Sequence, residues 1–222
     1  FFEEGRKRES LLRAANQYGK TVAGSFQAYC HATGRYPDWW PGRRFNRPTL
    51  GWIGGLSGVA VRDAAQTKLL GTPGDPASLG TAMVPKELIV PGSVNAARSA
   101  PNGVDSFLVR HVSGGNSRIV FKTYGQGAGD WQGPTVDWIW VDEEPPMDVY
   151  NEALARLTGE GHIFTTLSPL LGRSLLLLRF IGDLTPQQEK DRGAVRATIA
   201  EAEHITEEEK EQRRASFSQA ER

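Results

Sequence analysis

The chain has 222 residues, of which 39% are hydrophobic and 23% charged, as in an ordinary globular domain rather than a disordered or fibrous segment. A single cysteine, Cys30, excludes an internal disulfide framework and a cysteine-based zinc site. The 26 basic and 26 acidic side chains cancel, but residues 1–50 carry nine Lys/Arg against four Asp/Glu, and residues 136–185 carry three against eight. This asymmetry suits a site that holds a cation and an anionic ligand together.

Apolar strands and amphipathic helices alternate along the chain. The predicted strands cover residues 11–15, 49–53, 88–90, 104–112, 118–124, 136–141 and 162–167. The predicted helices cover residues 22–34, 58–70, 148–157 and 173–181, and a last polar helix opens at Thr206. This alternation predicts an α/β fold with a mostly parallel central sheet flanked by helices. In such sheets ligands gather where strands end, and polar clusters follow three of the predicted strands.

The first cluster runs from Ala14 to Thr21 and matches the phosphate-loop pattern G-x-x-x-x-G-K-[ST], except that Ala14 replaces its first glycine. Such a loop cradles phosphate oxygens with backbone N–H groups at a helix N-terminus. Lys20 would reach the β- and γ-phosphates, and the Thr21 hydroxyl would face Mg²⁺. A strand before the loop and a helix after it favour this interpretation over a chance match. The predicted nucleotide-binding residues are Asn16, Gln17, Tyr18, Gly19, Lys20 and Thr21.

The second cluster, Asp142-Glu143-Glu144, follows the apolar run 136–141 and is ended by two prolines. Asp142 resembles a Walker B carboxylate, which holds Mg²⁺ directly or through a water. Glu143 would orient or deprotonate the attacking water and is the predicted catalytic residue. Taken alone, this segment could also be an acidic turn after a sheet strand. Together with the phosphate loop, it predicts a P-loop NTPase of the RecA-like (ASCE) type, in which a glutamate follows the Walker B aspartate.

Hydroxyl side chains form the third cluster, at the end of the strand predicted over 162–167. Thr165, Thr166 and Ser168 lie where they could sense the γ-phosphate and pass its loss to neighbouring elements. The structural alternative is an ordinary capped strand end, because serine and threonine are common at such positions.

Several segments, in this order and spacing, resemble the ATPase half of the large terminase of tailed bacteriophages. They are Ala14–Thr21, Arg35–Trp40, Tyr124–Gly133, Val141–Pro146 and Thr165–Pro169 with Gly172. The pairing of Asn-Gln-x-Gly-Lys-Thr with Asp-Glu-Glu-Pro-Pro is quite specific to this family, and the resemblance covers nearly the whole chain.

The resemblance implies a motor that hydrolyses ATP with Mg²⁺ in the host bacterial cytoplasm and drives double-stranded DNA into a procapsid. The implied partners are DNA, the portal protein of the procapsid, the small terminase subunit and further copies of the chain in a ring, with no membrane. It also implies that Thr165, Thr166 and Ser168 couple hydrolysis to DNA movement. By the same resemblance, Phe2 lies beside the adenine.

The chain departs from some family members at one place in the phosphate loop. Those members carry an arginine where this chain has Asn16, so a charge-stabilising arginine must come from elsewhere, including a neighbouring subunit. The candidates are Arg98, Arg110, Arg118 and Arg173.

Two alternative functions stay open. The first is another P-loop nucleic-acid translocase or helicase, although that class usually has a polar Asp or His where Glu144-Pro145 stands. The second is a degenerate P-loop scaffold without hydrolysis, which only Ala14 supports. Residues 1–185 are predicted to form the ATPase core, and 186–222 a polar helical lid or linker leading toward a nuclease domain outside this chain. Nuclease activity is therefore not expected here.

Overall fold

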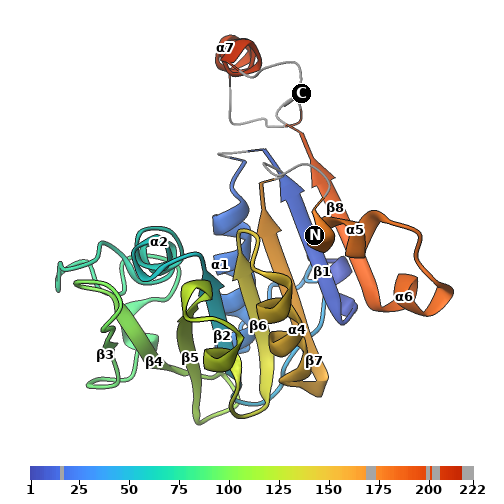
Figure 1. Ribbon diagram of the computed structural model, residues 1–222. Coiled ribbons are helices and arrows are strands. Elements are labelled where there is room, and N and C mark those ends of the chain that lie inside the picture. The colour runs from blue at the N-terminus through green and yellow to red at the C-terminus, as the bar shows by residue number, and fades with distance from the viewer. Residues whose placement is uncertain (16–17, 169–173, 199–200, 202–205, 217–222) are drawn as a thin grey trace.

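The computed structural model describes residues 1–15, 18–168, 174–198, 201 and 206–216 (Figure 1). The strands are β1 (Glu9–Ala14), β2 (Leu50–Gly55), β3 (Asn95–Ala96), β4 (Val104–Arg110), β5 (Asn116–Thr123), β6 (Val136–Asp142), β7 (Leu157–Leu167) and β8 (Arg192–Ala197). They form one sheet in the order β3-β4-β5-β2-β6-β7-β1-β8. In this spatial order, every neighbouring pair from β5 through β2, β6, β7 and β1 to β8 is parallel. Only β4 pairs antiparallel, with β3 on one side and β5 on the other. The predicted α/β fold with a mostly parallel sheet is confirmed.

Helices cover both faces of the sheet. They are α1 (Lys20–Thr33), α2 (Gly58–Val61), α3 (Thr67–Leu70), α4 (Met147–Ala155), α5 (Leu175–Ile181), α6 (Pro186–Asp191) and α7 (Glu207–Ser216). A π-helical turn, Arg62–Gln66, joins α2 to α3, so the single predicted helix over 58–70 is continuous but locally widened. Among the described residues, no helix is long and apolar enough to cross a membrane.

The alternation of side chains along β6 explains the two layers. Trp138 and Trp140 belong to the buried cluster under α1 and α3, whereas Ile139 and Val141 belong to the cluster under α4 and α5. A strand buried on both faces is mostly apolar, and the exception inside β6 is Asp137, whose carboxylate accepts hydrogen bonds from Arg47 and from the Leu50 N–H. In Figure 1, α1 lies behind the sheet and α4 in front of it.

The structure adds the short strand β3 and begins β7 at Leu157 rather than at residue 162, and it departs from the predicted elements at two further places. Residues 88–90, predicted as a strand, form part of a 3₁₀ turn and a single bridge between Ile89 and Val109. The sequence predicts a polar helical segment over 186–222, but β8 lies between α6 and α7 and pairs in parallel with β1 along its whole length. The sheet therefore extends past residue 185, and the predicted domain boundary there stays a prediction.

Candidate nucleotide-binding site

The phosphate-loop sequence lies where β1 ends and α1 begins. Gly19 has a φ of +89°, and a Cβ built on it would have no atom within 4 Å. Only glycine adopts this conformation freely, and the open space leaves its backbone accessible to a ligand. Asn16 and Gln17 lie outside the described residues. Ala14 is the buried last residue of β1, so the replaced glycine belongs to the strand end.

Lys20 opens α1 and is buried, with 6% of its surface exposed. Its Nζ donates to the carbonyl oxygen of Ala15 at 2.9 Å, so the ammonium group folds back over the loop. Burial lowers the pKa of Lys20, whereas the nearby Glu143 and Asp142 raise it. An ammonium group has three donors, and phosphate oxygens are suitable acceptors for it at such a loop.

Asp142 is the last residue of β6 and is 9% exposed. Its Oδ1 accepts a hydrogen bond of 2.6 Å from the Thr166 hydroxyl, and the Thr21 hydroxyl is near enough to favour the ionised form of this carboxylate. Burial, with the neighbouring Glu143, raises the pKa of Asp142 to about 6, against the opposing effects of the two hydroxyls and of Lys20. The structure thus brings together the two residues predicted to hold the metal, Thr21 and Asp142.

Glu143 has an unusual backbone, with a φ of +60°. Its Oε2 accepts from the Ser168 backbone N–H at 3.1 Å, and its Oε1 accepts from the Ser168 hydroxyl at 3.3 Å. A non-glycine residue in the left-handed region costs on the order of 1–3 kcal/mol and persists only where its surroundings impose it. Such strain concentrates at functional sites, which fits the catalytic role predicted for Glu143.

The predicted coupling residues lie between the two nucleotide motifs. β7 is the strand between β1 and β6, and its Thr165 and Thr166 are fully buried. Thr166 pairs with Asp142 on one side and with Leu12 on the other. A displacement at the end of β7 would therefore reach both the phosphate-loop strand and the acidic strand.

Tyr124 is a site residue whose role the sequence did not reveal. It is buried, and its hydroxyl lies 3.0 Å from the carbonyl oxygens of both Gly54 and Asp142, so that its one proton is shared between them. It therefore ties the carboxyl end of β2 to that of β6. The Tyr-Gly-Gln segment contributed to the family resemblance, but no local pattern assigned a contact to its tyrosine.

Two of the four arginine candidates lie at the wrong edge of the sheet for a role in this chain's own site. Arg118 pairs with Leu50, the first residue of β2, and Arg110 is the last residue of antiparallel β4. Both lie at the amino end of the parallel strands, opposite the phosphate loop. Arg98 is exposed, and the residue after it packs at the start of α2, beyond the carboxyl end of β2. Arg173 lies outside the described residues.

Phe2 packs in an aromatic cluster on the outer side of α1. Its ring centroid lies between 4.9 and 6.1 Å from those of Phe26, Trp39 and Trp40. Its predicted place beside the adenine stays a prediction.

The side chains present fit Mg²⁺ rather than a metal held by the protein alone. Among the described residues, no group of three or more His, Cys, Asp or Glu could hold a metal. One buried carboxylate beside one hydroxyl is the set that Mg²⁺ uses when phosphate oxygens and waters complete its shell. The Asp142–Thr21 pair matches this pattern.

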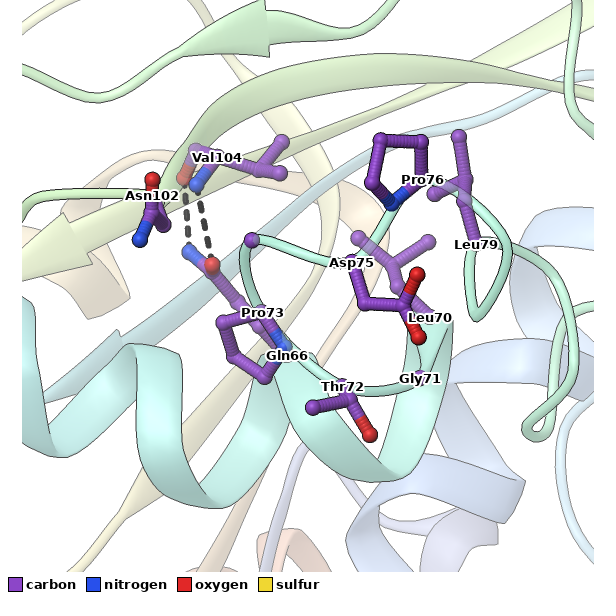
Figure 2. Close-up of a pocket in the computed structure, with 11 residues that line it drawn as sticks. Gln66, Leu70, Gly71, Thr72, Pro73, Asp75, Pro76, Leu79, Asn102 and Val104 are labelled. Atoms are coloured by element: carbon purple, nitrogen blue, oxygen red, sulfur yellow. Dashed lines mark hydrogen bonds between the residues drawn. The ribbon is translucent and has the colours of Figure 1, made fainter.

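A separate pocket of about 280 Å³ lies between α3, the loop that follows it and the start of β4 (Figure 2). Gln66 closes one side by donating to the Val104 carbonyl at 2.6 Å and accepting from the Val104 N–H at 2.9 Å. The other residues that line the pocket are Leu70, Gly71, Thr72, Pro73, Gly74, Asp75, Pro76, Leu79 and Asn102. No cation lines it among the described residues, so it does not suit a phosphate.

The fold and the site together define a P-loop NTPase, with one strand, β7, between the phosphate-loop strand and the acidic strand. Residues 11–222 match the family "Terminase large subunit, T4likevirus-type, N-terminal", and the chain belongs to this family. The resemblance found in the sequence is thereby confirmed.

Individual relatives agree with this assignment. The chain is 36% identical to the large terminase subunit of Salmonella phage P22 over 232 residues, which span 96% of this chain and 45% of the relative. It superposes on the large terminase of a thermophilic bacteriophage in complex with ADP with a TM-score of 0.69 at 15% identity, over 97% of this chain and 46% of the other. The ATP-gamma-S complex of that protein gives 0.63 at 14% identity, over 96% and 45%. At such identity the likeness to the thermophilic-phage terminase shows the fold, and this chain spans about half the length of these relatives.

Proposed function

We propose that this chain is the ATP-hydrolysing part of a viral DNA-packaging motor. The observation that carries the proposal is the meeting of Lys20, Asp142 and Glu143 at one edge of the sheet, next to the threonines of β7. Family membership and the nucleotides bound by the thermophilic-phage terminase support it.

Each residue has a distinct part in the proposed reaction. Lys20 binds the β- and γ-phosphates, while Thr21 and Asp142 hold Mg²⁺. Bound there, Mg²⁺ would offset the negative charge that develops on the phosphate oxygens. Glu143 orients the attacking water and accepts its proton. Glu143 also accepts hydrogen bonds from Ser168, the residue after β7. A change in the hydrogen bonds of Glu143 would therefore alter the contacts at the end of β7.

The proposed work of the motor is the translocation of double-stranded DNA into a procapsid. Its proposed partners are the DNA, the portal protein, the small terminase subunit and further copies in a ring, within the host bacterial cytoplasm. A DNA grip through phosphates would be independent of sequence and would weaken with salt. Among the three candidates that the structure describes, Arg98, exposed beyond the carboxyl end of β2, has the position that best suits contact with a nucleotide on a neighbouring copy.

Steady-state ATP hydrolysis tests the proposal. Glu143→Gln should lower kcat about 10²–10⁴-fold, because it removes the base but keeps the shape of the side chain. Glu160→Gln is the control: it is exposed near the amino end of β7, away from the site, and should stay within about twofold. A wild-type chain that hydrolyses no ATP, even with DNA and procapsids present, would contradict the proposal. Stimulation by portal-bearing procapsids without strand unwinding would separate this motor from a helicase.

A further inference from the structure

Trp140 is fully buried on β6, two residues before Asp142, and it contacts the site through one hydroxyl. Its Nε1 donates to the Thr166 hydroxyl at 2.8 Å, and that hydroxyl donates to Asp142 Oδ1 at 2.6 Å. A hydroxyl carries one proton. Because its oxygen accepts the indole N–H, the hydroxyl is turned so that its single proton meets the carboxylate. The orientation of the carboxylate thus depends on the indole.

Gly24 and Phe164 hold this indole in place. A Cβ on Gly24 would lie 2.3 Å from Cε2 of Trp140, so the absence of a side chain lets α1 pack directly on the ring. On β7, Phe164 stacks against it at an interplanar angle of 7° and a centroid distance of 6.4 Å. The helix that follows the phosphate loop and the strand that carries Thr166 therefore fix one ring between them.

We propose that Trp140 is a positioning residue for the carboxylate of Asp142, acting through the Thr166 hydroxyl. The inference rests on the proposed function, in which Asp142 holds Mg²⁺, and it adds a residue that touches neither metal nor nucleotide. Partners that orient a metal ligand typically contribute about 10–100-fold to metal affinity.

Trp138 provides a matched control on the same strand and face. It is also fully buried, its Nε1 donates to a threonine hydroxyl, that of Thr49, at 2.9 Å, and it packs directly on a glycine, Gly51. The Thr49 hydroxyl, however, donates to the carbonyl of His31 and not to a site carboxylate. The two tryptophans thus differ chiefly in the group to which their threonine partner donates its hydrogen bond.

The experiment measures Mn²⁺ binding to the chain with ADP by electron paramagnetic resonance, so that the readout does not depend on turnover. Trp140→Phe should raise the Mn²⁺ half-saturation point about tenfold. Trp138→Phe should leave the Mn²⁺ half-saturation point unchanged. The two variants should lower the melting temperature by similar amounts, because each loses one buried indole. Thr166→Val should raise the point at least as far as Trp140→Phe. Adding Trp140→Phe to Thr166→Val should cause no further rise, because the hydroxyl through which Trp140 acts is already gone.

Equal Mn²⁺ binding in Trp140→Phe and Trp138→Phe, with normal binding by the wild type, would overturn the inference about Trp140 but not the proposed function. Additive effects of Trp140→Phe and Thr166→Val would also overturn it. A wild-type chain that binds neither Mn²⁺ nor ADP would contradict the proposed function, and the inference with it. If Trp140→Phe does not fold, Thr166→Val tests the inference instead. Unchanged Mn²⁺ binding in that variant would show that the Thr166 hydroxyl does not position Asp142.

Discussion

Glu9 at the amino end of β1 and Asp142 at the carboxyl end of β6 are both buried carboxylates, and their surroundings differ. Glu9 is 3% exposed and accepts hydrogen bonds from Arg179 at 2.6 and 2.9 Å and from Arg192 at 3.1 Å. Asp142 accepts a hydrogen bond from the Thr166 hydroxyl, lies near the single ammonium group of Lys20, and has a second carboxylate next to it in the chain. The amino edge neutralises its own charge, whereas the carboxyl edge is set up to receive a cation from outside.

The amino edge of the sheet contributes to stability, whereas the carboxyl edge carries the residues for chemistry. The Glu9 cluster joins β1 to α5 and β8, and the Tyr150 hydroxyl of α4 donates to Glu9 at 2.9 Å. At the other edge, Asp142 and Glu143 are two carboxylates with one nearby ammonium group, that of Lys20, and the Glu143 backbone is strained. Residues that lower stability in this way are expected where a ligand completes the site.

The largest stability effect is expected from breaking the amino-edge cluster. Glu9→Gln leaves the Arg179 and Arg192 guanidinium groups without their carboxylate. Removing one partner of a buried ion pair destabilises by about 3–5 kcal/mol, which urea unfolding would measure. Glu4→Gln is a control, because the Glu4–Lys7 pair is partly exposed and should contribute less than about 1 kcal/mol. A loss below about 1 kcal/mol in Glu9→Gln would break the contrast between the edges.

A pH-dependent loss of stability is expected from two buried histidines, His31 on α1 and His162 on β7. Burial lowers the pKa of His162 to about 3 and that of His31 well below its usual range. Gln27 Nε2 donates to both rings, at 2.9 and 3.3 Å, which suits neutral imidazoles. The unfolded chain binds more protons below about pH 6.5, so this stability is present above that pH and is lost as the pH falls toward 3.

Urea unfolding between pH 7.5 and 5 checks this expectation. Each buried histidine contributes a slope of up to about 1.4 kcal/mol per pH unit below its unfolded pKa. His162→Gln should reduce the slope, whatever its effect on stability at pH 7.5. An identical slope in His162→Gln and the wild type would show that His162 does not cause the loss.

A smaller effect tests the backbone strain at Glu143. Glu143→Ala and Glu143→Gly both lose the carboxylate and its contacts to Ser168. Only glycine adopts a φ of +60° without strain, so Glu143→Gly should be more stable than Glu143→Ala by about 1 kcal/mol. Thermal unfolding of the two variants measures the difference. Equal stability would mean that the left-handed conformation is not retained.

The sequence predicted the clusters of the carboxyl edge because each consists of consecutive residues after an apolar strand. The Glu9 cluster could not be predicted in this way, since Glu9 lies in a charged run and meets Arg179 and Arg192, 170 and 183 positions further along. The role of Trp140 depends on the register that sets Thr166 opposite Asp142, which no local pattern encodes.

The edge strand β8 was also missed from the sequence. Its segment, Arg-Gly-Ala-Val-Arg-Ala, has one branched apolar side chain and is half exposed, so it lacks the alternation that marks a buried strand. Pairing with β1 and the contact of Arg192 with Glu9 place it in the sheet. Tertiary contacts therefore determine this strand more than its own residues do.

The most direct test of the contrast is the unfolding free energy of Asp142→Asn at pH 8, without nucleotide or Mg²⁺. Burial raises the pKa of Asp142 to about 6, above its unfolded value, so the folded chain at pH 8 is destabilised by the ionised carboxylate. Asparagine removes the charge and can still accept the Thr166 hydrogen bond. The account predicts that Asp142→Asn is more stable than the wild type by about 2 kcal/mol, opposite in sign to Glu9→Gln. A destabilised Asp142→Asn would contradict it, because Asp142 would then be neutralised within the chain as Glu9 is.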